Sequence, residues 1–398
     1  MALRIGFVAL PRSPDDSRLI HEAQALADRG HDVTVFALGA LHLPTGSPVR
    51  VASIGSGLPL RLGLRTLAVA RFVIEAGARL LQAHLESRFD VLIVRLGGEL
   101  VLLDAVAPRL AGAKLVLELE PGAERGKHPA RLRALAVAAD AVITSSEAQY
   151  RAVLDAGVPA YALSIVRDAP DACFAARAQE PRFGGQGPLR VVMHGPSRPA
   201  LASVVLPAFA EARKAEPRLS LRLLTEGGGW EGALADAQRL GLGADAFELA
   251  PGLAPPAVAR ALAEAHLGIA LGEDPQILPE GLVECLSVGL PVIALRVAWA
   301  GSEMEPRDIE RVEPGDARGL TEAILRLAHD RDRRAALASA AEAWRDEFGL
   351  AKQMSLFLRA IDHTCAEKLL AERRARQAAI DGVKTGSRKT PANEPDAS

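Results

Sequence analysis

The sequence predicts an α/β protein with two Rossmann-like domains, each built on a parallel sheet that helices cover on both faces. Three observations lead to this prediction. The chain has 398 residues, enough for two hydrophobic cores. Short apolar runs alternate with amphipathic helical patterns along most of it. The alternation stops at residues 177–188, a polar stretch rich in Gly and Pro, and then restarts, so this stretch is the expected linker.

Residues 1–176 are expected to form the first domain. An apolar run at residues 5–10 predicts its first strand, and residues 17–29 have the spacing of an amphipathic helix that ends at Gly30. The next strand is expected at residues 33–38. The remaining strand candidates are residues 91–94, 115–119, 141–144 and 162–166.

Residues 189–348 repeat this pattern and are expected to form the second domain. Its strand candidates are residues 189–193, 219–224, 247–249, 267–271 and 292–295. Residues 349–380 have a helical pattern with a break near Gly349, and the polar tail at 381–398 is expected to be disordered. Because open parallel sheets bind ligands at the carboxyl ends of their strands, a ligand site is expected in a cleft between the two sheets.

The composition is that of an ordinary globular protein, with 49% hydrophobic and 24% charged residues. A net charge of −2 argues against a broad nucleic-acid surface. Three widely spaced cysteines show no metal or disulfide spacing, which favours a reducing compartment. The sequence has neither a signal-peptide pattern nor a run of the roughly 18 apolar residues that a membrane helix needs. A cytoplasmic protein is therefore expected.

The most informative stretch is residues 271–295. A loop rich in Pro and Gly leads into a short helix that carries Glu284 and ends at Gly289, and Pro291 then opens a buried strand. A helix N-terminus that faces a cleft can bind an anion, and an acid one turn further in can hold the hydroxyls of a sugar or ribose. This arrangement suits a nucleotide-sugar donor.

Four segments resemble family 4 retaining glycosyltransferases of the GT-B fold. They are residues 15–38, 139–159, 278–294 and 312–341, and the resemblance runs from about residue 3 to about residue 360. It implies a donor nucleotide on the C-terminal domain, an acceptor on the N-terminal domain, retention of anomeric configuration and no obligatory metal or other cofactor. It also implies a last helix that crosses back onto the N-terminal domain, for which residues 350–371 are the candidate.

The resemblance places the donor site around Glu284, which matches the ribose-binding second acid of the family's paired-glutamate motif. The alternative is an exposed helix glutamate. The first acid of the motif falls at Gln276, an amide, and Gly281 stands where a Lys is usual. Glu273, Asp274 and Glu280 are nearby carboxylates that could substitute. Residues 278–283 are expected to present backbone N–H groups to the diphosphate or sugar, with a surface loop as the alternative. The named candidates in this segment are Pro279, Gly281, Leu282 and Val283.

Two further loops are expected at the donor. The first follows the opening strand of the second domain and holds Gly195, Ser197 and Arg198, of which Arg198 is the candidate to neutralise the leaving diphosphate. A solvent-facing Arg is the alternative. The second contains Gly227 in a Gly-rich turn, where the missing Cβ allows the backbone to approach a nucleotide base. A plain turn is the alternative.

Acceptor-side candidates follow strands of the first domain. Asp16 and Arg18 could bind the acceptor or pyrophosphate, although Asp16 could equally be only a helix N-cap. The resemblance implies an acid or His that touches the transferred sugar, and Glu118, Glu120 and His128 are the candidates. Glu118 and Glu120 share one face of a strand, and a buried structural role is the alternative for them.

Residues 60–85 form a basic amphipathic pattern with four arginines around an apolar stripe. Such a helix can lie on an anionic membrane, and many enzymes of this class use lipid-linked acceptors. The alternative is a helix packed on its own sheet. The inner face of the membrane is thus a second expected location.

These patterns predict a retaining glycosyltransferase that moves a hexose from a UDP- or GDP-sugar to a glycan, lipid-linked or small-molecule acceptor. Two alternatives stay open. Because Gln276 and Gly281 replace charged family residues, the chain could be a degenerate GT-B protein that binds a nucleotide, a glycan or a partner protein. It could also be an epimerase of the same fold, since such enzymes handle nucleotide sugars.

Overall fold

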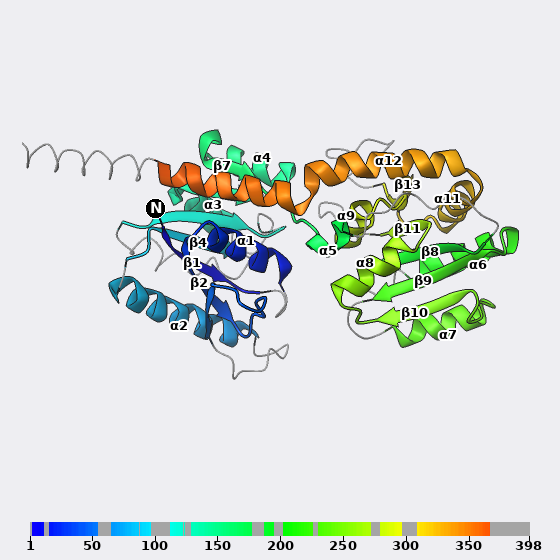
Figure 1. The fold of residues 1–398 in the computed structure, drawn as a ribbon, viewed down its shortest axis with the longest axis horizontal. Coiled ribbons are helices and arrows are strands. Elements are labelled where there is room, and N and C mark those ends of the chain that lie inside the picture. The colour runs from blue at the N-terminus through cyan, green and yellow to red at the C-terminus, as the bar shows by residue number, and fades with distance from the viewer. Residues whose placement is uncertain are drawn as a thin grey trace, which may run out of the picture.

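The predicted fold class is confirmed by a computed structural model, which contains two parallel sheets of seven and six strands (Figure 1). The structure describes residues 2–11, 16–54, 65–86, 88–96, 112–121, 123, 129–176, 187–194, 202–225, 230–271, 279–296 and 309–366.

The first sheet has the order β3-β2-β1-β4-β5-β6-β7, with every pair parallel. Its strands are β1 (Arg4–Ala9), β2 (Asp32–Leu38), β3 (Arg50–Ile54), β4 (Val91–Leu96), β5 (Lys114–Leu119), β6 (Ala141–Thr144) and β7 (Leu163–Ile165). Successive strands are added toward one edge of the sheet from β1 to β3 and toward the other edge from β4 onward. The boundary between β1 and β4 is therefore the topological switch point. The edge strand β3 was not predicted, because four of its five residues are at least partly exposed and its sequence lacks a continuous apolar run.

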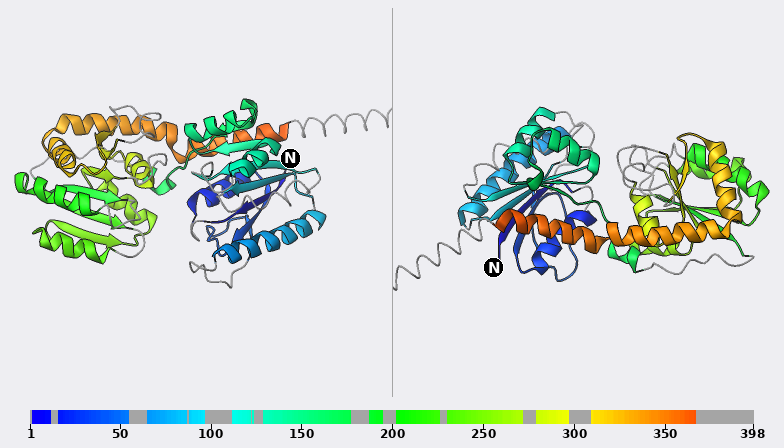
Figure 2. Two further views of the ribbon diagram at one scale, coloured as in Figure 1. Left: turned by 180° about the vertical axis from the view of Figure 1, so that it is seen from behind. Right: turned by 90° about the horizontal axis from the view of Figure 1, so that it is seen from above.

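Helices cover both faces of this sheet (Figure 2). They are α1 (Ser17–Asp28), α2 (Arg65–Glu86), α3 (Pro129–Ala138), α4 (Glu147–Asp155) and the short 3-10 helix η4 (Ala160–Ala162). The next helix, α5 (Ala172–Ala175), packs against helices of the second half instead. The core on one face contains residues of α2, α3 and α4, and the core on the other contains residues of α1. α1 starts where Asp16 accepts a hydrogen bond from the Leu19 amide, and Gly30 ends it with a φ of +83°.

The second sheet has the order β10-β9-β8-β11-β12-β13 and is also parallel throughout. Its strands are β8 (Leu189–His194), β9 (Leu219–Thr225), β10 (Phe247–Pro251), β11 (Leu267–Ala270), β12 (Val292–Leu295) and β13 (Glu310–Val312). The switch point lies between β8 and β11. The edge strand β13 was not predicted, since three residues with two charges carry no apolar run.

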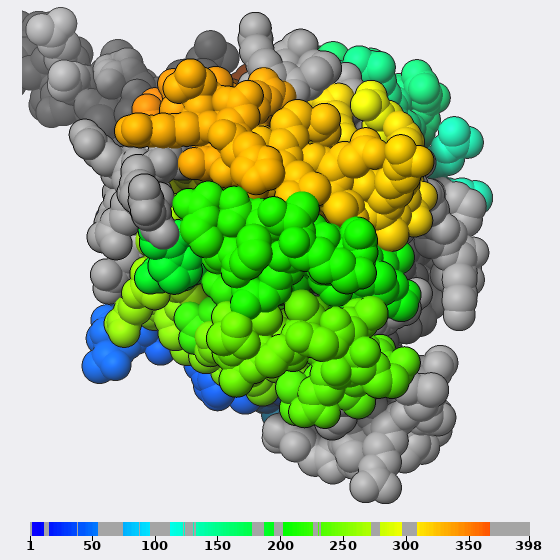
Figure 3. All heavy atoms as spheres, turned by 90° about the vertical axis from the view of Figure 1, so that its right-hand side faces the viewer, coloured from blue at the N-terminus to red at the C-terminus, as the bar shows by residue number. Residues whose placement is uncertain are grey.

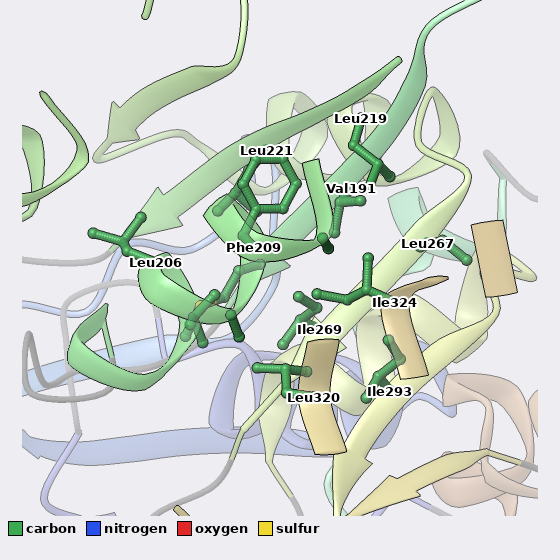
Figure 4. Packing of buried hydrophobic residues seen from close by; sticks show 14 of the residues in the cluster. Val191, Leu206, Phe209, Leu219, Leu221, Leu267, Ile269, Ile293, Leu320 and Ile324 are labelled. Atoms are coloured by element: carbon green, nitrogen blue, oxygen red, sulfur yellow. The ribbon is translucent and has the colours of Figure 1, made fainter. Parts of the chain in front are cut away.

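The helices of this half are α6 (Ala202–Ala215), α7 (Glu231–Arg239), α8 (Pro255–Ala263), α9 (Glu280–Ser287), α11 (Ala317–His329) and α12 (Arg331–Phe348). α6 and α11 pack together over one face of the sheet (Figure 3). Beneath them, Phe209 and Ile324 lie among strand residues such as Val191 and Ile269 (Figure 4). The opposite face carries a second core that contains residues of α8 and α9.

The chain returns to the first sheet after α12. Residues 350–366 are helical, and Phe357, Ile361 and Cys365 are buried in the core that contains α1 (Figure 2). Arg29 and Asp362 form an ion pair at 2.5 Å across this contact. The predicted crossing helix is therefore confirmed for residues 350–366.

The domain boundaries stay a prediction. Residues 177–186 of the expected linker and the whole tail from 381 lie outside the described residues. Within the described part of the chain, no helix is both long and apolar enough to cross a membrane. α2 packs against the sheet through Ala76 and Leu80, as the structural alternative expected, but it exposes 76% of Leu85.

Candidate functional site

Two polar side chains from distant parts of the sequence meet at the carboxyl ends of β8 and β11. His194 ends β8, and Glu284 lies on α9, which follows β11. In β8, Val191 and Met193 face the α6 side, so the alternation of a strand turns His194 toward α9. There, the His194 Nε2 contacts Oε2 of Glu284. His194 is 5% exposed and Glu284 is 8% exposed. The predicted donor-site acid is thus largely buried and held at the switch point, rather than being an exposed helix glutamate.

The first turn of α9 contains the backbone amides that were predicted to donate hydrogen bonds to the diphosphate. Pro279 occupies the N-cap without a side-chain capping bond. The amides of Leu282 and Val283 both donate to the Pro279 carbonyl, at 3.0 and 3.3 Å, and the two side chains lie in the core. These two amides are thus already engaged within the helix, and their contact with a ligand stays a prediction. The amide of Gly281 stays a predicted donor.

α9 approaches β11 closely at Gly268. A Cβ built there would lie 3.0 Å from Cys285 Sγ and 3.0 Å from Leu290 Cδ2. The absence of a side chain at Gly268 therefore fixes how deeply α9, and with it Glu284, sits against the sheet.

We expect Gly268→Ala to push α9 outward and to lower the free energy of unfolding by about 1–3 kcal/mol, the usual cost of overpacking a core. Chemical denaturation measures this loss. Gly232→Ala on α7 is the matched control, since nothing lies within 4 Å of its Cβ position. Equal stability of the two variants would contradict the close approach.

Two thiols lie near Glu284 but cannot serve as nucleophiles at neutral pH. Partial burial, with Asp171 and Glu284 nearby, raises the pKa of Cys173 to about 12. Burial and the charge of Glu284 raise the pKa of Cys285 even further. Because the thiolate is the reactive form, both sulfurs stay inert and protonated. α5, which carries Cys173, packs against α8 and α9.

The carboxyl edge of the first sheet is filled by a buried ion cluster, which we call the framework cluster. It consists of Asp16, Arg18, Glu22, Arg95, Glu118 and Asp168. Glu118 is its centre: one oxygen lies 2.7 Å from Arg18 Nε, and the other lies 3.1 Å from Arg95 Nε. Arg95 also reaches Glu22 at 2.6 Å.

Arg18 and Asp16 are engaged in the same way. Arg18 Nη1 pairs with Asp168 at 2.6 Å, and Nη2 donates to the Val166 carbonyl at 3.1 Å. Asp16 is the N-cap of α1 and lies 3.3 Å from Arg95 Nη1. Asp16 is thus a helix N-cap and Glu118 is a buried member of an ion cluster, as their structural alternatives expected, and Arg18 is held in the same cluster. Roles of these three residues in acceptor binding or catalysis stay predictions.

Glu22 is the unusual member of the framework cluster. Full burial and the neighbouring Glu118 raise the pKa of Glu22 to about 8, against the opposing effect of the two arginines. Burial also acts to raise the pKa of Glu118, but Arg18 and Arg95 overcome this and lower it. Glu118 is therefore the ionised member of the pair, and Glu22 holds a proton at neutral pH.

Four residues of these two sites were not predicted: Glu22, Arg95 and Asp168 of the framework cluster, and His194 beside Glu284. Arg95 interrupts the apolar run VLIVRL, and His194 ends the run LRVVMH, so a charged or polar residue inside a buried strand was the available signal. Glu22 gave no such signal, because an acid is common on an amphipathic helix.

The other predicted site residues are placed only in part. Glu120 is half-buried just beyond β5, and its carbonyl accepts a 2.9 Å hydrogen bond from Gln149. The remaining candidates lie outside the described residues: His128, Gly195, Ser197, Arg198, Gly227 and Gln276. Their roles stay predictions.

Comparison with known proteins identifies the first half of the chain. Residues 18–168 match the model of the glycosyl transferase 4-like domain. This confirms the predicted family resemblance for that part and shows that the chain carries a glycosyltransferase domain. A search of curated protein sequences finds no match.

Solved structures of the same fold cover nearly the whole chain. Anabaena Alr3699/HepE in complex with UDP and glucose has 19% identity and a TM-score of 0.65, covering 90% of this chain and 99% of that one. Sucrose-phosphate synthase from Thermosynechococcus elongatus has 17% identity and a TM-score of 0.62, covering 94% and 100%. A putative UDP-N-acetylglucosamine 2-epimerase from Listeria monocytogenes has 12% identity and a TM-score of 0.65, covering 92% and 98%. At such identities the likeness shows the fold, which is GT-B.

Proposed function

We propose that this chain transfers a hexose from a nucleotide diphosphate sugar to an acceptor, with retention of configuration. The premise is that it has the GT-B fold and carries a glycosyl transferase 4-like domain. A UDP-sugar is the first donor to test, because the similar Anabaena protein was crystallised with UDP and glucose. The glycosyltransferase domain model also favours a transferase over an epimerase.

The observation that carries this proposal is the position of Glu284. Its carboxylate lies at the switch point of the second sheet, largely buried, on a helix whose N-terminus faces the same edge. A carboxylate accepts charge-assisted hydrogen bonds from two vicinal hydroxyls, such as those of ribose. The helix N-terminus favours the diphosphate that follows the ribose in a nucleotide sugar.

The chemistry of this site fits attack by the acceptor hydroxyl from the leaving-group face. As the bond to the diphosphate breaks, its charge grows and the acceptor proton passes to a diphosphate oxygen. This route needs no protein nucleophile. The two thiols near Glu284 stay protonated, and both oxygens of Glu118 are already paired with arginines. Fixed dipoles at the diphosphate would then supply most of the rate acceleration.

Lipid-linked acceptors are our proposed acceptor class. α2 exposes Leu81 and Leu85 to solvent, on a helix whose sequence carries several arginines. An apolar and basic surface suits an anionic membrane. A transfer assay that offers a lipid-linked and a water-soluble acceptor side by side decides this point, since equal use of both would contradict it.

A degenerate binding protein remains the second candidate, and the first turn of α9 favours it. That turn carries the acid Glu280 and, at position 281, a buried Gly rather than a cation. A carboxylate near a bound diphosphate would weaken its binding by repulsion. Donor binding without transfer or hydrolysis of any donor would support this candidate.

The testing experiment is thermal unfolding with UDP, GDP and ADP, followed by transfer assays with the sugars of the nucleotide that binds. A ligand at 100 times its dissociation constant stabilises the folded state by about 2.7 kcal/mol. We expect Glu284→Ala to weaken binding at least about tenfold, which lowers this stabilisation to about 1.4 kcal/mol. Unchanged nucleotide binding by the variant would show that the donor site lies elsewhere.

A further inference from the structure

We propose that His194 is a positioning residue for the donor: it holds one oxygen of the Glu284 carboxylate so that the other can accept hydrogen bonds from the ribose. This inference rests on the proposed function, because it assigns a role within the same donor site. The predicted loop at residues 194–198 begins with His194, but the sequence singled out Arg198 there.

The two side chains come from rigid elements. β8 is an inner strand, paired with β9 on one side and with β11 on the other. α9 is packed so closely against β11 that a Cβ at Gly268 would lie only 3.0 Å from Cys285 Sγ. Because neither backbone can shift easily, the contact between His194 Nε2 and Glu284 Oε2 fixes the direction of the carboxylate.

The second carboxylate oxygen is left for a ligand. Among the described residues, the Glu284 carboxylate has the ion-pair contact of His194 at Oε2 and no hydrogen-bond donor, and a tenth of this side chain remains exposed. A glutamate has several rotatable bonds, and ordering it costs conformational entropy. When His194 holds the carboxylate before the nucleotide arrives, less of this cost falls on binding.

The charges around the pair suit this role. The Nε2 of His194 faces Oε2 of Glu284 as an ion-pair contact, and an imidazole nitrogen can carry the proton that a carboxylate attracts. The adjacent thiols of Cys173 and Cys285 are neutral, because their pKa values are raised. His194 thus orients the Glu284 carboxylate through one oxygen and leaves the other able to accept hydrogen bonds.

The test compares binding of UDP and 2′,3′-dideoxy-UDP by calorimetry, using the full chain. We expect the parent chain to prefer UDP by at least about tenfold, the size of a hydrogen bond to a charged group. Glu284→Ala should abolish this preference, and His194→Ala should reduce it severalfold. His194→Gln should restore most of it, because the Gln amide can still donate to Glu284.

Ser287→Ala is the matched control on the same helix. Its hydroxyl donates to the Val283 carbonyl at 2.8 Å and is no part of the pair, so the variant should keep the parent preference. A merely structural role of His194 would lower the affinities for both nucleotides equally and leave their ratio unchanged. That result would overturn the inference.

Two other outcomes are distinguishable. A parent chain that binds neither UDP nor GDP overturns the proposed donor site, and this inference falls with it. A parent chain that prefers UDP, with the same preference in His194→Ala but not in Glu284→Ala, overturns this inference alone. If His194→Ala does not fold, His194→Asn replaces it, since the shorter amide does not reach Glu284.

Discussion

Arg95→Met should destabilise the protein by about 3–5 kcal/mol, the usual cost of breaking a buried ion pair by removing one partner. Arg95 is 3% exposed and contacts three carboxylates of the framework cluster: Asp16, Glu22 and Glu118. Methionine fills similar space but leaves these groups without half of their positive partners. This loss is a large fraction of the roughly 5–15 kcal/mol by which a folded protein is typically stable.

Urea denaturation followed by circular dichroism measures the loss. Arg151→Met is the matched control, because Arg151 is exposed and, among the described residues, pairs only with Glu147 one helical turn away. Such surface pairs contribute less than about 1 kcal/mol. If both variants lose the same small amount, the carboxylates of the framework cluster do not depend on Arg95.

Most strands of the first domain could be predicted from the sequence, but the contacts of the framework cluster could not. Buried parallel strands appear as continuous apolar runs, so β1, β2, β4, β5 and β6 were predictable from local sequence alone. The edge strand β3 was not, since pairing on one side only leaves it partly exposed. Arg95 looked like an interruption of its strand, because its partners lie 23 to 79 residues away in the sequence.

The proposed donor site on the second sheet could also be predicted only in part from local sequence. Glu284 could be singled out because its helix, its loop and the following strand form one local pattern. Its partner His194 lies 90 positions earlier, and only the sheet order β8-β11 with α9 above it brings the two together. Local pattern therefore identifies the acid, whereas tertiary structure identifies what orients it.

The two sheet edges differ in a way that bears on function. At the first sheet, the polar groups of the carboxyl edge satisfy one another, so this edge is a rigid support. At the second sheet, Glu284 has one oxygen held by His194 and no described donor to the other. Within the described part of the chain, the second sheet is therefore where a carboxylate is left to accept bonds from a ligand, and acceptor contacts by the first domain stay a prediction.

Glu22→Gln should remove much of the pH dependence of stability between about pH 5 and 8. The folded state raises the pKa of Glu22 to about 8, above its ordinary value of 4.5, because the carboxyl is buried beside Glu118. Between these two values the folded state binds more protons than the unfolded state. The contribution of Glu22 is therefore fully present below about pH 4.5 and is lost as the pH rises through 8.

The wild-type free energy of unfolding should fall across this window, with a slope of up to about 1.4 kcal/mol per pH unit from this group. Glutamine mimics the protonated acid and does not titrate. The variant should thus exceed the wild type by only about 1.4 kcal/mol at pH 5.5, and by progressively more at pH 7 and 8.5. Other groups, such as His21 with its lowered pKa, titrate in both proteins and cancel in the difference.

Melting temperatures of the two proteins at pH 5.5, 7 and 8.5 measure this effect. Glu118→Gln is the contrasting control: Arg18 and Arg95 lower the pKa of Glu118 despite its burial, so its loss should destabilise at all three pH values. Parallel curves for wild type and Glu22→Gln would show that Glu22 is ionised in the folded state. The arginines of the framework cluster would then balance both glutamates, and Glu22 would hold no proton at neutral pH.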